Sequence, residues 1–234
     1  MADPVVKRAL AYPYNIPDGS YLLTPDGFEE LEDGVRLPDL RHRHPILATG
    51  SNQSPERLGD KFDGLMMEPI PVLKARLKNF DAVYSPHFSS YGSIPATLHP
   101  APGVTVDLFV TWLNDAERDR MHETEALGQN YDYEELVGTP VEIDRVGEQE
   151  NVFTYMGRRG ALMHQDRPMA LADVRAEGRL WSSATQIQVQ ELAREKLAPE
   201  KRLDQFILEN INDVKVRRHR TDELSRDAKR PALR

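Results

Sequence analysis

The stretch Ile46–Leu58, with the sequence ILATGSNQSPERL, joins an apolar run to a turn and then to the start of a helix. Ser54 is a favourable N-cap residue, and Pro55 suits the first position of a helix. The pattern therefore predicts a strand, a tight loop and a helix. Small residues such as Gly50-Ser51-Asn52 let the backbone approach a ligand closely, and their N–H groups can face an anion. A tight turn that only connects strand and helix fits the same residues.

Extended segments are expected on both sides of this stretch. Residues 1–45 are rich in proline, glycine and turn pairs such as Pro25-Asp26-Gly27, which favour short strands and turns over a long helix. We interpret them as an arm draped over the core. Residues 72–84 alternate between apolar and basic side chains, as a half-buried strand does. A second strand is predicted from Val104 to Leu113, after a turn at Pro100-Ala101-Pro102-Gly103.

Helices follow the second strand. Asn114 and Glu117 form a capping-box pattern, which predicts a helix that carries Met121, His122 and Glu125 and ends near Gly128. Extended segments at 131–133 and 152–156 come next. Two further helices are expected, at 184–197 with Ser183 as cap and from Pro199 to Val214. The first would turn Ile187, Leu192 and Leu197 inward, and we expect both to dock on their own domain.

The predicted fold class is α+β, with a strongly bent mixed β-sheet or small β-barrel, flanking helices and additional C-terminal helices. We divide the chain into an N-terminal arm (1–45), a core (46–178), C-terminal helices (179–214) and a basic tail (215–234). Residues 201–234 hold ten bases and six acids, a balance of +4. The tail is interpreted as a solvated, partly disordered end, and a protein partner that binds it is the alternative.

Composition excludes several classes of protein. The chain has 234 residues, no cysteine, and 30 basic against 38 acidic side chains, giving a net charge of −8. Disulfides, thiolate metal sites and cysteine nucleophiles are therefore excluded. Net acidity argues against nucleic-acid binding, and no apolar run approaches the roughly 18 residues of a membrane span. The start MADPVVKRAL lacks a signal-peptide core, so we predict a soluble, cytoplasmic protein without a membrane partner.

Few residues stand out as carriers of chemistry. Glu125 ends an acidic helix, and a carboxylate that leaves a helix into a cleft can act as general acid and base. Most helical glutamates are simply solvated, and Glu117 and Glu123 are interpreted as surface charges of that kind. His42 and His44, or His122 with Glu125, complete no known metal motif. No metal and no cofactor are predicted, and no serine-hydrolase, P-loop or dinucleotide fingerprint is present.

Taken together, the ordered motifs resemble the gamma-glutamylcyclotransferase-like family. The resemblance covers about residues 46–178 and rests on Gly50-Ser51-Asn52, the segment 91–100 (YGSIPATLHP), the strand 103–113, the segment 121–125 (MHETE) and Tyr131. Gly160-Ala161-Leu162 and residues 167–171 (RPMAL) lie within the same region. The order and spacing of these motifs carry the resemblance, since each is weak alone.

Three positions depart from the family pattern. Thr49 stands where an aromatic residue normally precedes the glycine, Gln53 where an apolar residue often follows the asparagine, and His122 where an aspartate precedes the glutamate. The arm and the basic tail lie outside the region that resembles the family. A match of fold is therefore safer than a match of activity.

The resemblance implies a cofactor-free enzyme that acts on a small molecule with a gamma-glutamyl group. The substrate's alpha-amine would attack its own gamma-carbonyl and release 5-oxoproline, which is transferase or lyase chemistry. Glu125 would carry the proton, and Gly50, Ser51, Asn52, Thr49 and Tyr131 would bind the substrate. Two alternatives stay open: a catalytically silent member of the fold that binds a small molecule or a protein, and an enzyme that hydrolyses a different amide.

Overall fold

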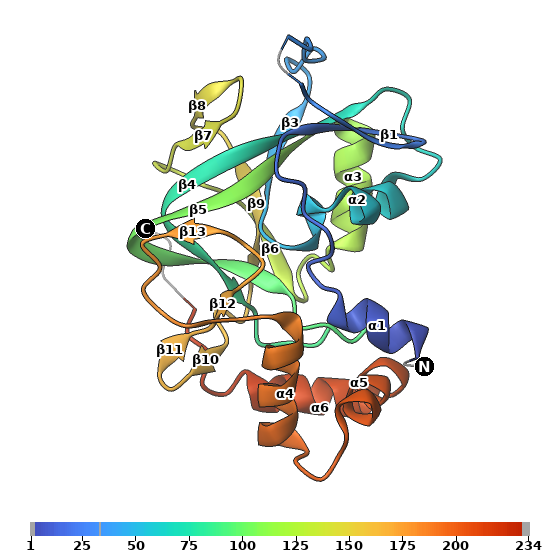
Figure 1. Ribbon diagram of the computed structural model, residues 1–234, viewed down its shortest axis with the longest axis vertical. Coiled ribbons are helices and arrows are strands. Elements are labelled where there is room, and N and C mark those ends of the chain that lie inside the picture. Colours follow the sequence, from blue (N-terminus) through green and yellow to red (C-terminus); the bar gives the residue numbers. More distant parts are fainter. Residues whose placement is uncertain (1–2, 33, 231–234) are drawn as a thin grey trace.

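Two long antiparallel strands, β4 (Ile70–Tyr84) and β5 (Ala96–Leu113), form the centre of the molecule (Figure 1). The computed structural model describes residues 3–32 and 34–230. Within these ranges the main sheet contains 12 strands, and its path β14-β12-β4-β5-β3-β9-β6 does not close into a barrel. It is mixed, because β3 pairs in parallel with β9, and β12 with β14. The predicted α+β class with a mixed sheet is confirmed, and the barrel alternative is not observed.

The other strands are short. They are β1 (Tyr21–Thr24), β2 (Gly27–Glu30), β3 (His44–Ala48), β6 (Tyr131–Glu135), β7 (Val141–Ile143), β8 (Gly147–Gln149), β9 (Phe153–Gly157), β10 (Met163–His164), β11 (Arg167–Pro168), β12 (Ala170–Leu171), β13 (Ala176–Glu177) and β14 (Ser183–Ala184). The helices are α1 (Pro4–Leu10), the 3₁₀ turn η1 (Ser51–Gln53), α2 (Pro55–Phe62), α3 (Asp115–Thr124), α4 (Gln186–Leu197), α5 (Leu203–Asn212) and α6 (Val214–Leu224).

The alternation predicted for β4 is present. Leu73, Ala75 and Leu77 are buried, while the basic residues between them face outward. The break predicted at Pro100-Ala101-Pro102-Gly103 is wrong, since β5 runs through it without interruption. Its partner β4 has a register shift at the same level, where Asn79 adopts a φ of 64° and accepts a hydrogen bond from the Gly103 N–H at 3.0 Å. The residues that would make a turn in isolation therefore form a bend shared by two strands.

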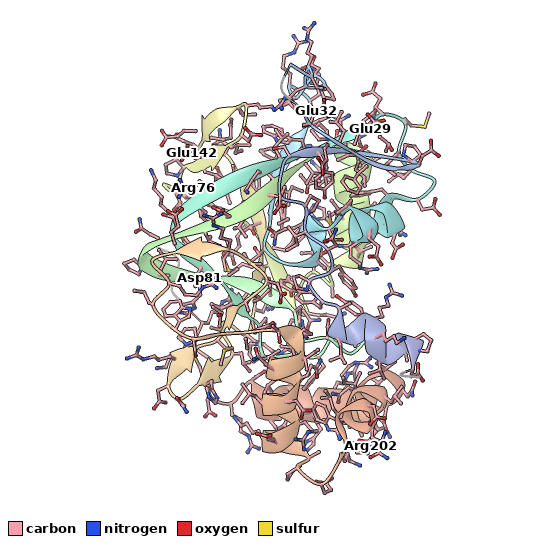
Figure 2. The ribbon with its side chains drawn as sticks, in the orientation of Figure 1. Glu29, Glu32, Arg76, Asp81, Glu142 and Arg202 are labelled. Carbon is pink, nitrogen blue, oxygen red and sulfur yellow. The ribbon has the colours of Figure 1, made fainter. Side chains whose placement is uncertain are left out.

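A buried ion pair joins β4 to the segment that precedes β14. Asp81, labelled in Figure 2, is buried in β4 and accepts two hydrogen bonds from the Arg179 guanidinium, at 2.9 and 3.0 Å. The same guanidinium donates to the carbonyl oxygen of Val174 at 2.8 Å. This bidentate pair holds the segment before β14 against the long strand.

The capping box of α3 is formed as predicted. The Glu117 N–H donates to Asn114 Oδ1 at 2.9 Å, and the Asn114 N–H donates to Glu117 Oε2 at 2.8 Å. The interpretation of Glu117 as a surface charge is wrong: it is fully buried and forms an ion pair with Arg43 at 3.3 Å. Burial raises the pKa of Glu117. Its partner is distant in sequence, so helix periodicity alone gives no sign of the pair.

The C-terminal helices share a hydrophobic core with the sheet, so they dock on it as predicted. Helix α1 packs beside α5 (Figure 1). Helix α4 is capped by Thr185 rather than Ser183, which lies in β14. Ile187 is 52% exposed rather than inward-facing, while Val189 and Ala193 are buried. Residues 214–224 form α6 instead of a disordered tail, and residues 231–234 lie outside the described residues.

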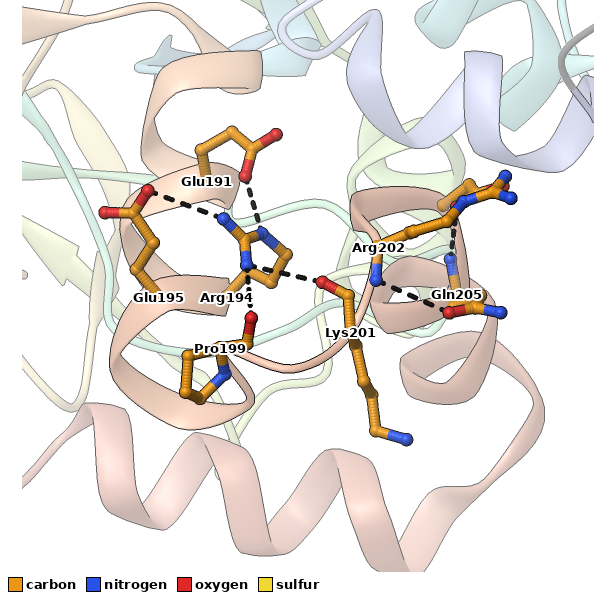
Figure 3. A network of polar contacts seen from close by, with 8 residues as sticks. Glu191, Arg194, Glu195, Pro199, Lys201, Arg202 and Gln205 are labelled. Carbon is orange, nitrogen blue, oxygen red and sulfur yellow. Dashed lines mark hydrogen bonds and ion pairs between the residues drawn. The ribbon is translucent and has the colours of Figure 1, made fainter.

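Polar contacts shape the connection between α4 and α5 (Figure 3). Arg194 donates to the carbonyl oxygens of Pro199 at 3.1 Å and Lys201 at 3.3 Å, and its Nε donates to Glu191 at 2.6 Å. Helix α6 is held by Arg220, which donates to Asn210 Oδ1 at 2.9 Å and lies over the Phe206 ring. None of the described helices is long and apolar enough to cross a membrane.

Candidate functional site

A cavity of about 580 Å³ opens where β3 ends, between α2, α3 and the start of β5. Its walls include all six residues that the sequence singled out for substrate binding and catalysis: Thr49, Gly50, Ser51, Asn52, Glu125 and Tyr131. They come from segments more than 70 residues apart in the chain. The structure thus brings the predicted residues to one place.

The predicted strand–loop–helix unit forms one wall of this cavity. Strand β3 ends at Ala48, η1 follows Gly50 directly, and α2 begins at Pro55. A Cβ atom on Gly50 would lie 1.9 Å from Tyr12 Oη and 3.1 Å from the Ala96 Cβ, so only glycine fits there. Because Ser51 and Asn52 open a helical turn, their N–H groups have no partner within that turn. They are available to an anionic ligand.

Glu125 enters the cavity from the C-terminal end of α3. Its Oε1 accepts a hydrogen bond from Asn52 Nδ2 at 3.0 Å and forms an ion pair with Lys61 Nζ. Both charged side chains are largely buried, with 14% of Glu125 and 10% of Lys61 exposed. The carboxylate is therefore held in a fixed position by one amide and one ammonium group. Lys61 Nζ also lies 3.3 Å from Met121 Sδ.

A tight turn brings Tyr131 to the same cavity. The N–H groups of Gln129 and Asn130 donate to the Ala126 carbonyl oxygen, and the Gly128 N–H donates to that of Tyr131. The Tyr131 hydroxyl then donates to the Ala96 carbonyl oxygen at 3.1 Å. Burial, then the nearby Glu125 carboxylate, raises the pKa of Tyr131 well above its ordinary value. Tyr131 is therefore a neutral phenol at physiological pH.

Two buried groups complete this wall. The Ala96 N–H donates to Tyr12 Oη at 2.7 Å, so Tyr12 and Tyr131 bind the backbone N–H and the carbonyl oxygen of the same residue. His87 packs edge-on against the Tyr131 ring, with centroids 5.6 Å apart. Burial, together with the positive charge of Arg159, lowers the pKa of His87 to about 3. His87 is thus neutral, and its Nδ1 lies 3.1 Å from Ser85 Oγ.

Two of the residues that line the cavity have a buried polar atom without a partner. Thr49 Oγ1 and Asn52 Oδ1 are buried and form no hydrogen bond with any described residue. A buried polar atom of this kind is costly unless something binds it. Thr49 and Asn52 both line the cavity beside Gly50.

The histidines do not assemble a metal site. His122 Nδ1 lies 2.8 Å from Tyr155 Oη, whereas Glu125 pairs with Lys61, so the two have different partners. His44 contacts Asp115 at 2.8 Å, and His42 is exposed. Within residues 3–32 and 34–230, no group of three or more His, Asp or Glu side chains is arranged to hold a metal ion.

Sequence reasoning missed several residues of the cavity. Arg8 and Tyr12 come from the arm, and nothing in their local sequence places them there. Arg57 and Lys61 had a usable signal, because they stand four residues apart on the helix that follows the glycine loop and so share one of its faces. Tyr12 also supplies an aromatic ring against Gly50, although the residue before that glycine is Thr49.

Comparison with solved structures finds similar chains. One is titled gamma-glutamyl cyclotransferase; it is 21% identical, with a TM-score of 0.41, and the match covers 49% of this chain and 66% of that one. YkqA from Bacillus subtilis is 13% identical, with a TM-score of 0.42 and coverage of 84% and 72%. An Arabidopsis thaliana protein determined in solution is 16% identical, with a TM-score of 0.39 and coverage of 78% and 91%.

No protein-family model matches the chain, and no curated protein matches it. The chain spans just under two thirds of the gamma-glutamyl cyclotransferase chain to which it is similar. All these likenesses are below 25% identity and below a TM-score of 0.5. The chain is nonetheless similar to a solved gamma-glutamyl cyclotransferase, a protein of the family that its sequence motifs resemble.

Proposed function

We propose that the protein is a cofactor-free gamma-glutamyl cyclotransferase-like enzyme. The observation that supports this most directly is the position of Glu125, a largely buried carboxylate fixed by Asn52 and Lys61 inside the cavity that the glycine loop lines. The order of the sequence motifs supports the same reaction. The substrate would be a gamma-glutamyl amide, in which the gamma-carboxyl group of glutamate is joined to an amine.

The reaction needs little beyond positioning and one proton carrier. The substrate's alpha-amine attacks its own gamma-carbonyl carbon, a carbon–nitrogen bond forms, and the bond to the leaving amine breaks. Glu125 takes the proton from the attacking nitrogen and gives it to the leaving nitrogen, so 5-oxoproline and a free amine are the products. Holding the substrate in the folded conformation can supply effective molarities of about 10⁵ M or more.

The loop would stabilise negative charge. The N–H groups of Ser51 and Asn52 lack partners within η1 and would donate to the substrate's carboxylate or to the oxygen that becomes negative during attack. Such a donor contributes about 3 kcal/mol to transition-state stabilisation. Thr49 and Asn52, which line the cavity beside this loop, would bind the substrate's remaining polar groups.

One observation favours the second candidate, a binding module without turnover. The ammonium group of Lys61 pairs directly with Glu125, so the carboxylate already has a charged partner before any substrate enters. A molecule with a free amine and a carboxylate would still fit the same cavity. Binding without chemistry therefore has its own structural support.

Mass spectrometry after incubation with a panel of gamma-glutamyl amides separates these functions. Cyclotransfer predicts 5-oxoproline together with the free amine, in equal amounts and without uptake of oxygen from labelled water. Glutamate that carries the label would indicate hydrolysis instead. Ligand binding by calorimetry without either product would contradict the proposal and favour the binding module.

A further inference from the structure

The hydroxyl group of Tyr12, in the N-terminal arm, has a hydrogen that no described residue accepts. Tyr12 Oη accepts a hydrogen bond from the Ala96 N–H at 2.7 Å. This contact leaves the O–H hydrogen free, because a phenol can accept and donate at the same time. Tyr12 lines the cavity and is only 4% exposed. A buried donor of this kind is costly unless a bound group accepts its hydrogen.

This hydroxyl group lies directly beside the glycine loop. A Cβ atom on Gly50 would be 1.9 Å from Tyr12 Oη and 3.0 Å from Tyr12 Cζ, so the phenol occupies the space that a side chain at position 50 would need. The N–H groups of Ser51 and Asn52 open the helical turn that follows Gly50 and have no partner within it. The free O–H of Tyr12 is therefore close to the loop whose backbone donors would stabilise negative charge.

Two other tyrosines of the cavity wall have acceptors for their hydrogens within the protein. Tyr131, which the sequence singled out for substrate binding, donates to the Ala96 carbonyl oxygen at 3.1 Å. Tyr155 Oη lies 2.8 Å from His122 Nδ1, which can accept its hydrogen. Tyr12 has no such acceptor, so its hydroxyl group can donate to a bound molecule without breaking a contact inside the protein.

The structure keeps Tyr12 in place and keeps it protonated. Val6 and Ala9 of α1 belong with Tyr12 to the main hydrophobic core, and α1 packs against α5. Burial, and then the neighbouring hydroxyl groups of Tyr131 and Tyr91, raise the pKa of Tyr12 well above its ordinary value. The phenol therefore retains its proton near neutral pH and acts as a fixed hydrogen-bond donor. Fixed donors aimed at charge that develops in the transition state are a major source of catalysis.

We propose that Tyr12 is a further catalytic residue, whose hydroxyl group donates a hydrogen bond to the substrate's gamma-carbonyl oxygen as that oxygen becomes negative. This inference rests on the proposed function and deepens it. When the alpha-amine attacks, the electron pair of the carbonyl π bond moves onto the oxygen, and it returns when the leaving amine departs. Tyr12 keeps its proton throughout, while Glu125 moves the proton between the two nitrogens. The N-terminal arm, which lies outside the region that resembles the family, then completes the reaction centre.

Tyr12→Phe tests this role, because it removes the hydroxyl group and keeps the ring. With gamma-glutamylglycine as substrate, we expect kcat for 5-oxoproline release to fall about 10²-fold and KM to change little, since the hydrogen bond strengthens in the transition state. Tyr14→Phe is the matched control. It removes a hydroxyl group from the same arm, but Tyr14 does not line the cavity, so kcat should stay at the wild-type value.

A change in the substrate locates the contact. The thioamide of gamma-glutamylglycine has sulfur, a weaker hydrogen-bond acceptor, in place of the gamma-carbonyl oxygen, and release of glycine is measured for both compounds. If Tyr12 donates to that oxygen, the two changes affect the same contact. The ratio of kcat/KM for the oxygen and sulfur compounds should then differ between the wild-type protein and Tyr12→Phe by about twofold or more. A tyrosine that only anchors the arm would leave this ratio unchanged.

Thermal unfolding shows whether Tyr12→Phe is folded without an acceptor for the Ala96 N–H. If it is not, Tyr12→3-fluorotyrosine replaces it, because that variant keeps the acceptor and changes only the strength of the donor, and the oxygen-to-sulfur ratio should again differ from wild type. A folded Tyr12→Phe protein with wild-type kcat, a loss confined to KM, or an unchanged ratio would overturn the role of Tyr12 and leave the proposed function intact. Absence of 5-oxoproline with the wild-type protein would overturn both.

Discussion

Gly50, in the wall of the cavity, leaves less room for a Cβ atom than any other described glycine. The Gly50→Ala substitution would place its Cβ 1.9 Å from Tyr12 Oη, so we expect stability to fall by about 1–3 kcal/mol from overpacking. Urea unfolding measures the change. Gly59→Ala is the matched control, because nothing lies within 4 Å of its Cβ and it sits inside α2. That variant should gain about 0.4–1 kcal/mol, and a Gly50→Ala protein as stable as wild type would contradict the packing described.

His87 gives the stability of the protein a predictable dependence on pH. Its pKa is lowered to about 3 by burial, whereas an unfolded histidine titrates near 6.5, so the unfolded chain binds more protons between these values. Stability therefore falls as the pH drops below about 6.5, with a limiting slope of about 1.4 kcal/mol per pH unit from this residue.

The contribution of His87 is isolated by comparing two variants. His87→Gln should flatten the stability profile between pH 6.5 and 4, measured by chemical unfolding at a series of pH values. His42→Gln, which alters an exposed histidine, should keep the wild-type slope. Identical slopes for the wild-type protein and His87→Gln would show that His87 is not held neutral in the folded state.

At the scale of elements, the C-terminal helices support a wall of the cavity. Gln190 of α4 donates to the Gly92 carbonyl oxygen at 2.6 Å, and Ser225, after α6, donates to that of Pro86 at 2.7 Å. Phe206 of α5 is fully buried against Phe88. The loop of residues 85–95, which carries His87 and Tyr91, is therefore held from outside by all three helices.

Phe206→Ala tests this support. Loss of a fully buried phenylalanine should cost about 3–5 kcal/mol of unfolding free energy. Ile187→Ala on α4 should change stability by less than about 0.5 kcal/mol, since that side chain is half exposed. Thermal unfolding of both variants is the measurement. Equal, small effects would mean that the helices are not part of the same cooperative unit.

The sequence predicted correctly those elements that depend on interactions between residues close together in the chain. The apolar-basic alternation of residues 72–78, the capping box at Asn114 and the loop after β3 all depend on neighbours within a few residues. The unbroken β5 depends instead on Asn79 in the partner strand, and burial of Glu117 depends on Arg43, 74 residues away. No local pattern contains these partners.

At the scale of the whole molecule, the cavity is assembled from distant parts of the chain. The motifs that resemble the cyclotransferase-like family predicted six of its residues, because these follow directly from the strand–loop–helix unit and the end of α3. The sequence did not predict that Arg8 and Tyr12 of the arm line the cavity. Residues 1–45 contain turn signals, but no local pattern indicates which part of the core the arm covers. Tyr12 reaches Ala96 across 84 residues of sequence.

The central claim is that Glu125 transfers the proton in a cyclisation within this cavity. The most direct test compares the rate of 5-oxoproline release by the wild-type protein, Glu125→Gln and Glu123→Gln, with gamma-glutamylglycine as substrate. Glu123 is exposed on the same helix and pairs with Arg120, so its variant controls for loss of charge on α3. We predict a loss of about 10²-fold or more for a Glu125→Gln protein that is still folded, and wild-type rates for Glu123→Gln. A folded Glu125→Gln protein that releases 5-oxoproline at the wild-type rate would contradict the account.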